Sequence, residues 1–91
     1  MNILITGIAG LIGSNFADYI LKNKKNINII GIDNLSGGDK SNINENIIFY
    51  EEDLSNFDKI EEIFKLHNIN YVFHFGAYAA ECLSPFIRKF N

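Results

Sequence analysis

The chain has 91 residues, of which 47% are hydrophobic and 21% charged, and its formal net charge at pH 7 is −3. This length permits one small domain at most, and the composition is that of a folded chain. Acidic and basic residues are interleaved, which argues against a basic face for nucleic acid or an anionic membrane. The N-terminal apolar run is too short for a signal peptide or a membrane span, and the lone Cys82 cannot form an internal disulfide. We therefore expect a cytoplasmic protein without a membrane segment, a nucleic-acid partner or a metal site.

Strand and helix patterns alternate along the first half of the chain. Apolar residues 3–5 predict a buried strand, and the polar stretch 34–46 predicts a long surface loop. Between them we expect a helix from about Leu11 to about Lys24 and a second strand from Ile27 to Asp33. The spacing of apolar side chains places one stripe of this helix against the core: Ile12, Phe16, Tyr19 and Ile20.

The second half repeats the alternation. A third strand is expected at 47–50 and a fourth at 71–75, with a helix over 56–67 that has Ser55 as its N-cap and Asn68 as its left-handed C-cap. Ser84-Pro85 predicts the start of a further helix that carries Phe86, Ile87 and Phe90. Strands that alternate with helices favour parallel pairing with right-handed crossovers. The predicted fold class is α/β, a Rossmann-type doubly wound parallel sheet that is truncated after about four strands.

A glycine-rich run lies where the first strand turns into the first helix. It reads T-G-x-x-G-x-x-G from Thr6 to Gly13, one residue longer between its first two glycines than the common dinucleotide fingerprint. Gly7 permits a tight turn, Gly10 lets the backbone approach a pyrophosphate, and Gly13 lets the helix pack closely on the sheet. Free N–H groups at the start of the helix would face the phosphates.

Acidic residues follow the second and third strands. Asp33 lies 20 residues beyond Gly13, the spacing of the acid that binds the adenosine ribose, and its charge favours NAD over NADP because it would repel a 2′-phosphate. Asp53 is placed for an adenine contact, and equally for a simple role near the start of a helix. His74, at the end of an apolar strand, is interpreted as a structural histidine satisfied by backbone groups, with a general base as the less favoured alternative.

These residues resemble the extended short-chain dehydrogenase/reductase family, and within it the NAD-dependent epimerases and dehydratases of sugar nucleotides, with the UDP-glucose 4-epimerases nearest in pattern. The matching stretches cover nearly all of the chain: Thr6–Ser14, Gly31–Gly38, Asp53-Leu54 and His74–Ala80. The resemblance implies a cofactor site with four parts. They are Leu11 and Ile12 along the pyrophosphate, Asp33, Asn34, Leu35 and Ser36 around the ribose, Asp53 and Leu54 at adenine, and Phe75, Gly76 and Ala77 on the nicotinamide side.

Two departures from the family pattern bear on function. Members of the 4-epimerase branch often carry a lysine where Ala79 stands, and the family's catalytic Tyr-x-x-x-Lys does not occur in this sequence. The resemblance therefore implies that residues 1–91 are the N-terminal part of an NAD(P)-binding Rossmann domain, with no catalytic residue and without the substrate domain. The full-length parent would take a nucleotide sugar, act by transient hydride transfer to NAD, and form a homodimer. A non-catalytic dinucleotide-binding module or redox sensor of the same fold is the alternative.

Overall fold

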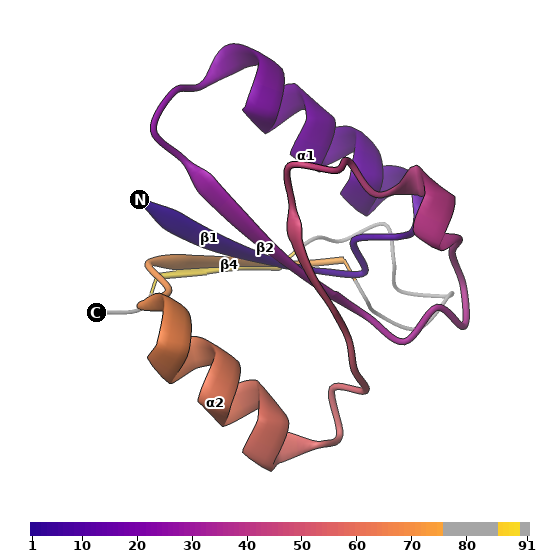
Figure 1. Cartoon of the computed structure of the whole chain (residues 1–91), viewed down its shortest axis with the longest axis vertical. Coiled ribbons are helices and arrows are strands. Elements are labelled where there is room, and N and C mark those ends of the chain that lie inside the picture. Colours follow the sequence, from indigo (N-terminus) through magenta and orange to yellow (C-terminus); the bar gives the residue numbers. More distant parts are fainter. Residues whose placement is uncertain (76–85, 90–91) are drawn as a thin grey trace.

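The computed structural model describes residues 1–75 and 86–89 (Figure 1). Its elements follow one another as β1 (Asn2–Thr6), α1 (Leu11–Asn23), β2 (Asn28–Asp33), the short 3-10 helix η1 (Lys40–Asn42), β3 (Ile48–Glu51), α2 (Phe57–His67), β4 (Tyr71–His74) and β5 (Phe86–Lys89). Within these two described ranges, no helix has the length and apolar character needed to cross a membrane.

The strands form one sheet in the order β3-β2-β1-β4-β5. β1 lies between β2 and β4 and pairs in parallel with both, so that Leu4 is opposite Ile30 on one side and Val72 on the other. β3 continues the parallel sheet beyond β2. Figure 1 shows α1 and α2 on opposite faces of this sheet, which confirms the doubly wound parallel arrangement predicted from the sequence.

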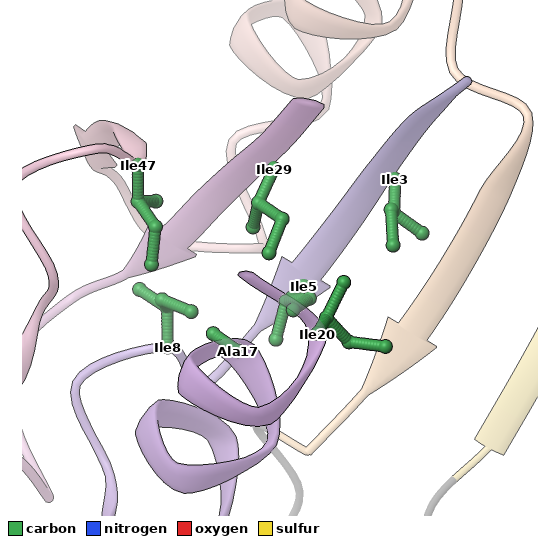
Figure 2. Packing of buried hydrophobic residues seen from close by; sticks show 7 residues of the cluster. All are labelled: Ile3, Ile5, Ile8, Ala17, Ile20, Ile29 and Ile47. Carbon is green, nitrogen blue, oxygen red and sulfur yellow. The ribbon is translucent and has the colours of Figure 1, made fainter. Parts of the chain in front are cut away.

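The core is divided by the sheet into two clusters. Alternate residues of β1 supply them, with Ile3 and Ile5 on the α1 side and Leu4 on the α2 side. Figure 2 shows the first cluster, which joins β1 and β2 to Ala17 and Ile20 of α1. A strand covered on both faces accounts for the unbroken apolar run at its sequence position. β1 is packed in this way up to its last residue, Thr6, and the glycine-rich run continues from there into α1.

The buried face of α1 differs from the predicted stripe. Ile20 is buried and Phe16 packs against the core, but Ile12 and Tyr19 are 46% and 58% exposed. The buried residues of α1 are Gly13, Ser14, Ala17 and Ile20, and the first three of them are small. Small residues let the helix axis approach the sheet closely, which turns the larger neighbouring side chains outward. Apolar periodicity alone does not register this, because glycine and serine carry no hydrophobic signal.

Two further expectations are corrected. α2 begins at Phe57, so its N-cap is Asn56 and not Ser55 as expected, and the Ser55 N–H donates to the Asp53 carboxylate at 2.8 Å. The expected C-terminal helix is wrong over Phe86–Lys89, which form β5 antiparallel to β4, whereas Ser84 and Pro85 lie outside the described residues. β4 would otherwise present an open edge, and β-favouring residues pair with such an edge. Asn68 is confirmed as the left-handed C-cap of α2, with φ of 50°.

Replacing Gly13 with alanine should destabilise the protein by about 1–3 kcal/mol, the usual cost of overpacking a close contact. A Cβ at Gly13 would overlap the Gly7 carbonyl oxygen and lie 3.0 Å from its carbon, so the first turn of α1 must shift. Urea unfolding of the complete gene product measures the change, and Gly37→Ala is the matched control because a Cβ there meets no described residue within 4 Å. Equal unfolding midpoints for the two variants would contradict the expected close contact.

Candidate functional site

Residues 7–10, which we call the glycine turn, lead from the end of β1 into α1. Gly7 has φ of 70°, in the left-handed region that glycine adopts without strain, and its N–H donates to the Ile32 carbonyl of β2 at 2.9 Å. The Gly10 N–H donates back to the Gly7 carbonyl at 3.1 Å, and the first intrahelical bond of α1 runs from the Ser14 N–H to the Gly10 carbonyl at 2.9 Å. The turn is therefore closed by its own backbone hydrogen bonds. It places the start of α1 at the carboxyl end of β1.

The N-terminus of α1 is uncapped. Gly10 is its N-cap residue and supplies no side chain, so within the described ranges the N–H groups of Leu11, Ile12 and Gly13 meet no acceptor. Three such donors at the positive end of a helix dipole suit an anion. Among the described residues, a Cβ on Gly10 would meet only the Gly7 carbonyl oxygen, at 3.4 Å, so none of them crowds the position beside Gly10. These features fit a pyrophosphate.

Asp33 holds the glycine turn to the end of β2. Its Oδ2 accepts from the Ala9 N–H at 2.9 Å and its Oδ1 from the Leu35 N–H at 2.8 Å, and its side chain is half-buried. The sequence predicted a ribose-binding carboxylate at this position and did not predict the bond to Ala9. Each carboxylate oxygen accepts more than one hydrogen bond, so both oxygens retain capacity for a ligand hydroxyl.

The segment after β2 is shaped by local side-chain hydrogen bonds. The Ser36 N–H donates to Asn34 Oδ1 at 3.0 Å, and Leu35 adopts a left-handed φ of 63°. Asn and Asp form such turns with the backbone two residues on. Asp33 lies against the glycine turn through its bond with Ala9, and the role of residues 33–36 around the ribose stays a prediction.

Residues 37–42, which we call the backing loop, pack against Ala9 of the glycine turn. The Asp39 N–H and the Asn42 side-chain amide both donate to the Ala9 carbonyl, at 3.2 and 2.9 Å. Gly38 lies against Ala9 so closely that a Cβ would overlap it. The sequence predicts only a surface loop for this stretch. The Gly37-Gly38 pair was the one signal that could have indicated a close backbone approach.

Asp53 follows β3 and is exposed at the same edge of the sheet. Its pKa lies below the usual range, chiefly because the backbone N–H of Ser55 donates to the carboxylate, with the Ser55 hydroxyl and then the Asn34 side chain acting in the same direction. Asp53 therefore lies within reach of Asn34, which follows β2. Leu54 packs against the second core cluster, so its side chain is partly buried there.

The last part of the site lies at the ends of β1 and β4. Thr6 Oγ1 and His74 Nδ1 are 2.5 Å apart, so His74 is satisfied by a hydroxyl rather than by the backbone groups that we expected. The Phe75 N–H donates to the Thr6 carbonyl at 3.1 Å, and its ring packs on Phe16 with centroids 5.4 Å apart. Gly76 and Ala77 lie outside the described residues. In the part of the chain that is described, no cluster of His, Cys, Asp or Glu is arranged to hold a metal ion.

Together, a glycine turn, an uncapped helix and a carboxylate at the end of the neighbouring strand define a dinucleotide-binding α/β unit. A model of the NAD dependent epimerase/dehydratase family matches residues 3–86, and the chain belongs to this family.

Individual relatives agree with this assignment. The UDP-glucuronate 4-epimerase of Thermodesulfobacterium geofontis is 33% identical over 84% of this chain and 26% of its own length. The crystal structure of a Thermotoga maritima UDP-glucose 4-epimerase with UDP-glucose is similar with a TM-score of 0.81 and 46% identity, over 87% of this chain and 25% of that one. A Bacillus anthracis dTDP-glucose 4,6-dehydratase in complex with NAD has a TM-score of 0.81 and 32% identity, over 90% of this chain and 28% of that one. The chain thus spans about a quarter of the length of these relatives.

Proposed function

We propose that residues 1–91 form the first part of the NAD-binding domain of a sugar-nucleotide epimerase or dehydratase. The observation that carries the proposal is the placement of the open helix N-terminus next to Asp33, whose carboxylate is fixed by the Ala9 N–H at 2.9 Å. One group suits a pyrophosphate and the other a ribose diol. Relatives that act on UDP-sugars and dTDP-sugars, one of them solved with NAD, support the substrate class.

Each part of the site has a role in this proposal. The N–H groups at the start of α1 bind the pyrophosphate, with Leu11 and Ile12 along it, and residues 33–36 surround the adenosine ribose. Asp53 and Leu54 hold adenine, and residues 75–77 line the nicotinamide side. NAD, when bound, supplies a reversible hydride acceptor for a sugar hydroxyl. The chain itself binds and orients the cofactor, and the Ala9 and Leu35 N–H groups hold the Asp33 carboxylate in position toward the ribose.

Selectivity for NAD over NADP follows from how firmly Asp33 is held. Its two backbone hydrogen bonds, to Ala9 and Leu35, keep the carboxylate from rotating away from the ribose. A 2′-phosphate would therefore meet a fixed like charge. The nearest cation downstream in sequence is Lys40, and no arginine follows Asp33 before Arg88. Binding of NADP should be weaker for this reason.

Asp33→Ala should weaken NAD binding by about 1.5–3 kcal/mol, the loss expected when hydrogen bonds to a charged acceptor are removed, and should narrow the difference from NADP. Calorimetry on the complete gene product measures both affinities. Asp18→Ala is the matched control, because Asp18 is exposed on α1. Equal affinities of the unmutated protein for NAD and NADP would refute the proposed role of Asp33.

The function is tested with the same complete protein. Calorimetry measures NAD binding, and incubation with UDP-sugars and dTDP-sugars followed by chromatography measures epimerisation or dehydration. NAD binding with conversion of a nucleotide sugar is the expected result. NAD binding without conversion of any nucleotide sugar would favour the non-catalytic module, and absence of NAD binding would overturn the proposed function.

A further inference from the structure

We propose that the backing loop, residues 37–42, sets the position of the glycine turn for pyrophosphate binding, and that Gly38 and Asn42 are positioning residues for the cofactor. This inference rests on the proposed function, since it concerns how the same site is held. Neither residue belongs to the predicted cofactor contacts. Both act on the ligand through the backbone of Ala9.

Ala9 is held from both of its backbone polar groups. Its residue is fully buried, at 0% exposure, and its N–H donates to Asp33 while its carbonyl accepts from the Asp39 N–H and the Asn42 side-chain amide. Asp33 is the last residue of β2, and Asp39 and Asn42 belong to the loop that follows it. The Ala9 carbonyl and the Gly10 N–H belong to one planar peptide unit. Fixing the carbonyl therefore fixes the plane through which the chain enters the first turn of α1.

Gly38 supplies the surface against which this peptide rests. A Cβ at Gly38 would overlap the Ala9 carbonyl carbon and oxygen and lie 2.7 Å from the Gly10 nitrogen. All three atoms are backbone, so the clash cannot be relieved by turning a side chain. At Gly37, one residue earlier, an added Cβ would have no atom of residues 1–75 or 86–89 within 4 Å. The two neighbouring glycines therefore differ sharply in what an added methyl group would do.

The effect should be selective for the pyrophosphate side of the site. α1 is anchored to the sheet by Ala17 and Ile20, which the backing loop does not hold. Residues 33–36, which are proposed to surround the ribose, keep their own hydrogen bonds. These run from the Leu35 N–H to Asp33 and from the Ser36 N–H to Asn34. A disturbed backing loop thus leaves the turns of residues 33–36 and the body of α1 in place and shifts the first turn of α1, whose N–H groups face the phosphates.

The experiment compares two matched pairs of variants in the complete gene product. Gly38→Ala is paired with Gly37→Ala. Asn42→Ala is paired with Asn46→Ala. Asn46 donates only through its backbone N–H, to Asn44, and its side chain makes no hydrogen bond to a described residue. Calorimetry, by direct or competitive titration, gives the dissociation constants of NAD, ADP and adenosine, and thermal unfolding without ligand gives the stability of each variant.

We expect Gly38→Ala and Asn42→Ala to raise the dissociation constants of NAD and ADP by about tenfold, corresponding to about 1.4 kcal/mol. The constant for adenosine should change less than about twofold, and Gly37→Ala and Asn46→Ala should bind all three ligands as the unmutated protein does. The inference would be overturned if Asn42→Ala and Gly38→Ala left the affinities unchanged. It would also be overturned if the two variants lost affinity for ADP and adenosine equally, in proportion to their loss of thermal stability. An unmutated protein that does not bind NAD would instead overturn the proposed function. If Gly38→Ala does not fold, Asn42→Ala decides the question.

Discussion

Replacing Gly10 with valine in the complete gene product should raise the dissociation constant of NAD by more than about a hundredfold, or roughly 2.7 kcal/mol. The branched side chain would stand in front of the N–H groups at the start of α1, where the pyrophosphate is proposed to bind. The backbone of Gly10, with φ of −77° and ψ of 166°, is extended and accepts any residue. Calorimetry with NAD measures the loss, and thermal unfolding without ligand should show a small change.

Gly10→Ala is the graded control for this prediction. Among the described residues its Cβ would meet only the Gly7 carbonyl oxygen at 3.4 Å, an ordinary contact, so the fold should be kept and the loss of affinity should be smaller than for valine. Unchanged NAD affinity in the valine variant would show that the turn is not the pyrophosphate site. A valine variant that fails to fold would show that the space in front of Gly10 is occupied by the protein itself.

Residues 1–91 expressed alone should have no epimerase or dehydratase activity. The tyrosines of this stretch, Tyr19, Tyr50, Tyr71 and Tyr78, are followed four residues later by Asn23, Leu54, Phe75 and Cys82, so the stretch lacks the Tyr-x-x-x-Lys pair that the family uses to move the proton. A nucleotide-sugar conversion assay against a buffer control measures this. Turnover above that control would show that other residues of this stretch supply the acid–base chemistry.

The same stretch should fold only marginally by itself. A chain this short buries a small fraction of its surface, so its free energy of unfolding should lie at or below about 5 kcal/mol. NAD at a hundredfold excess over its dissociation constant would add about 2.7 kcal/mol. Unfolding followed with and without NAD tests this, and a sharp transition at high temperature without ligand would contradict it.

Local sequence patterns predicted most of the fold. The strands at 2–6 and 28–33, and both helices, lie within one or two residues of their predicted positions, because their signals come from periodicity and capping chemistry within each segment. The errors concern contacts between segments. β5 pairs with an edge that only the assembled sheet presents, and the buried face of α1 depends on how closely the helix approaches β1.

The candidate site shows the same division. Gly7, Gly10, Gly13 and Asp33 could be identified from spacing, because the family motif records them directly. Their cofactor contacts stay predictions, and what the structure adds is the scaffold around them. The contacts of Ala9 with Asp33, Asp39 and Asn42 join residues up to 33 positions apart, and no local pattern encodes them. The Thr6–His74 hydrogen bond, across 68 positions, is of the same kind.

The double role proposed for the Asp33 carboxylate, in holding Ala9 and in binding the ribose, has a consequence for protein engineering. A substitution meant to admit a 2′-phosphate would also remove the acceptor of the Ala9 N–H and leave a buried backbone donor without a partner. Cofactor preference and the shape of the phosphate-binding turn are therefore not independent variables at this position. An asparagine would remove the charge and retain one acceptor oxygen, whereas alanine would remove both. A redesign that begins with a short polar acceptor, and only then introduces a cation for the phosphate, would change recognition without disturbing the turn.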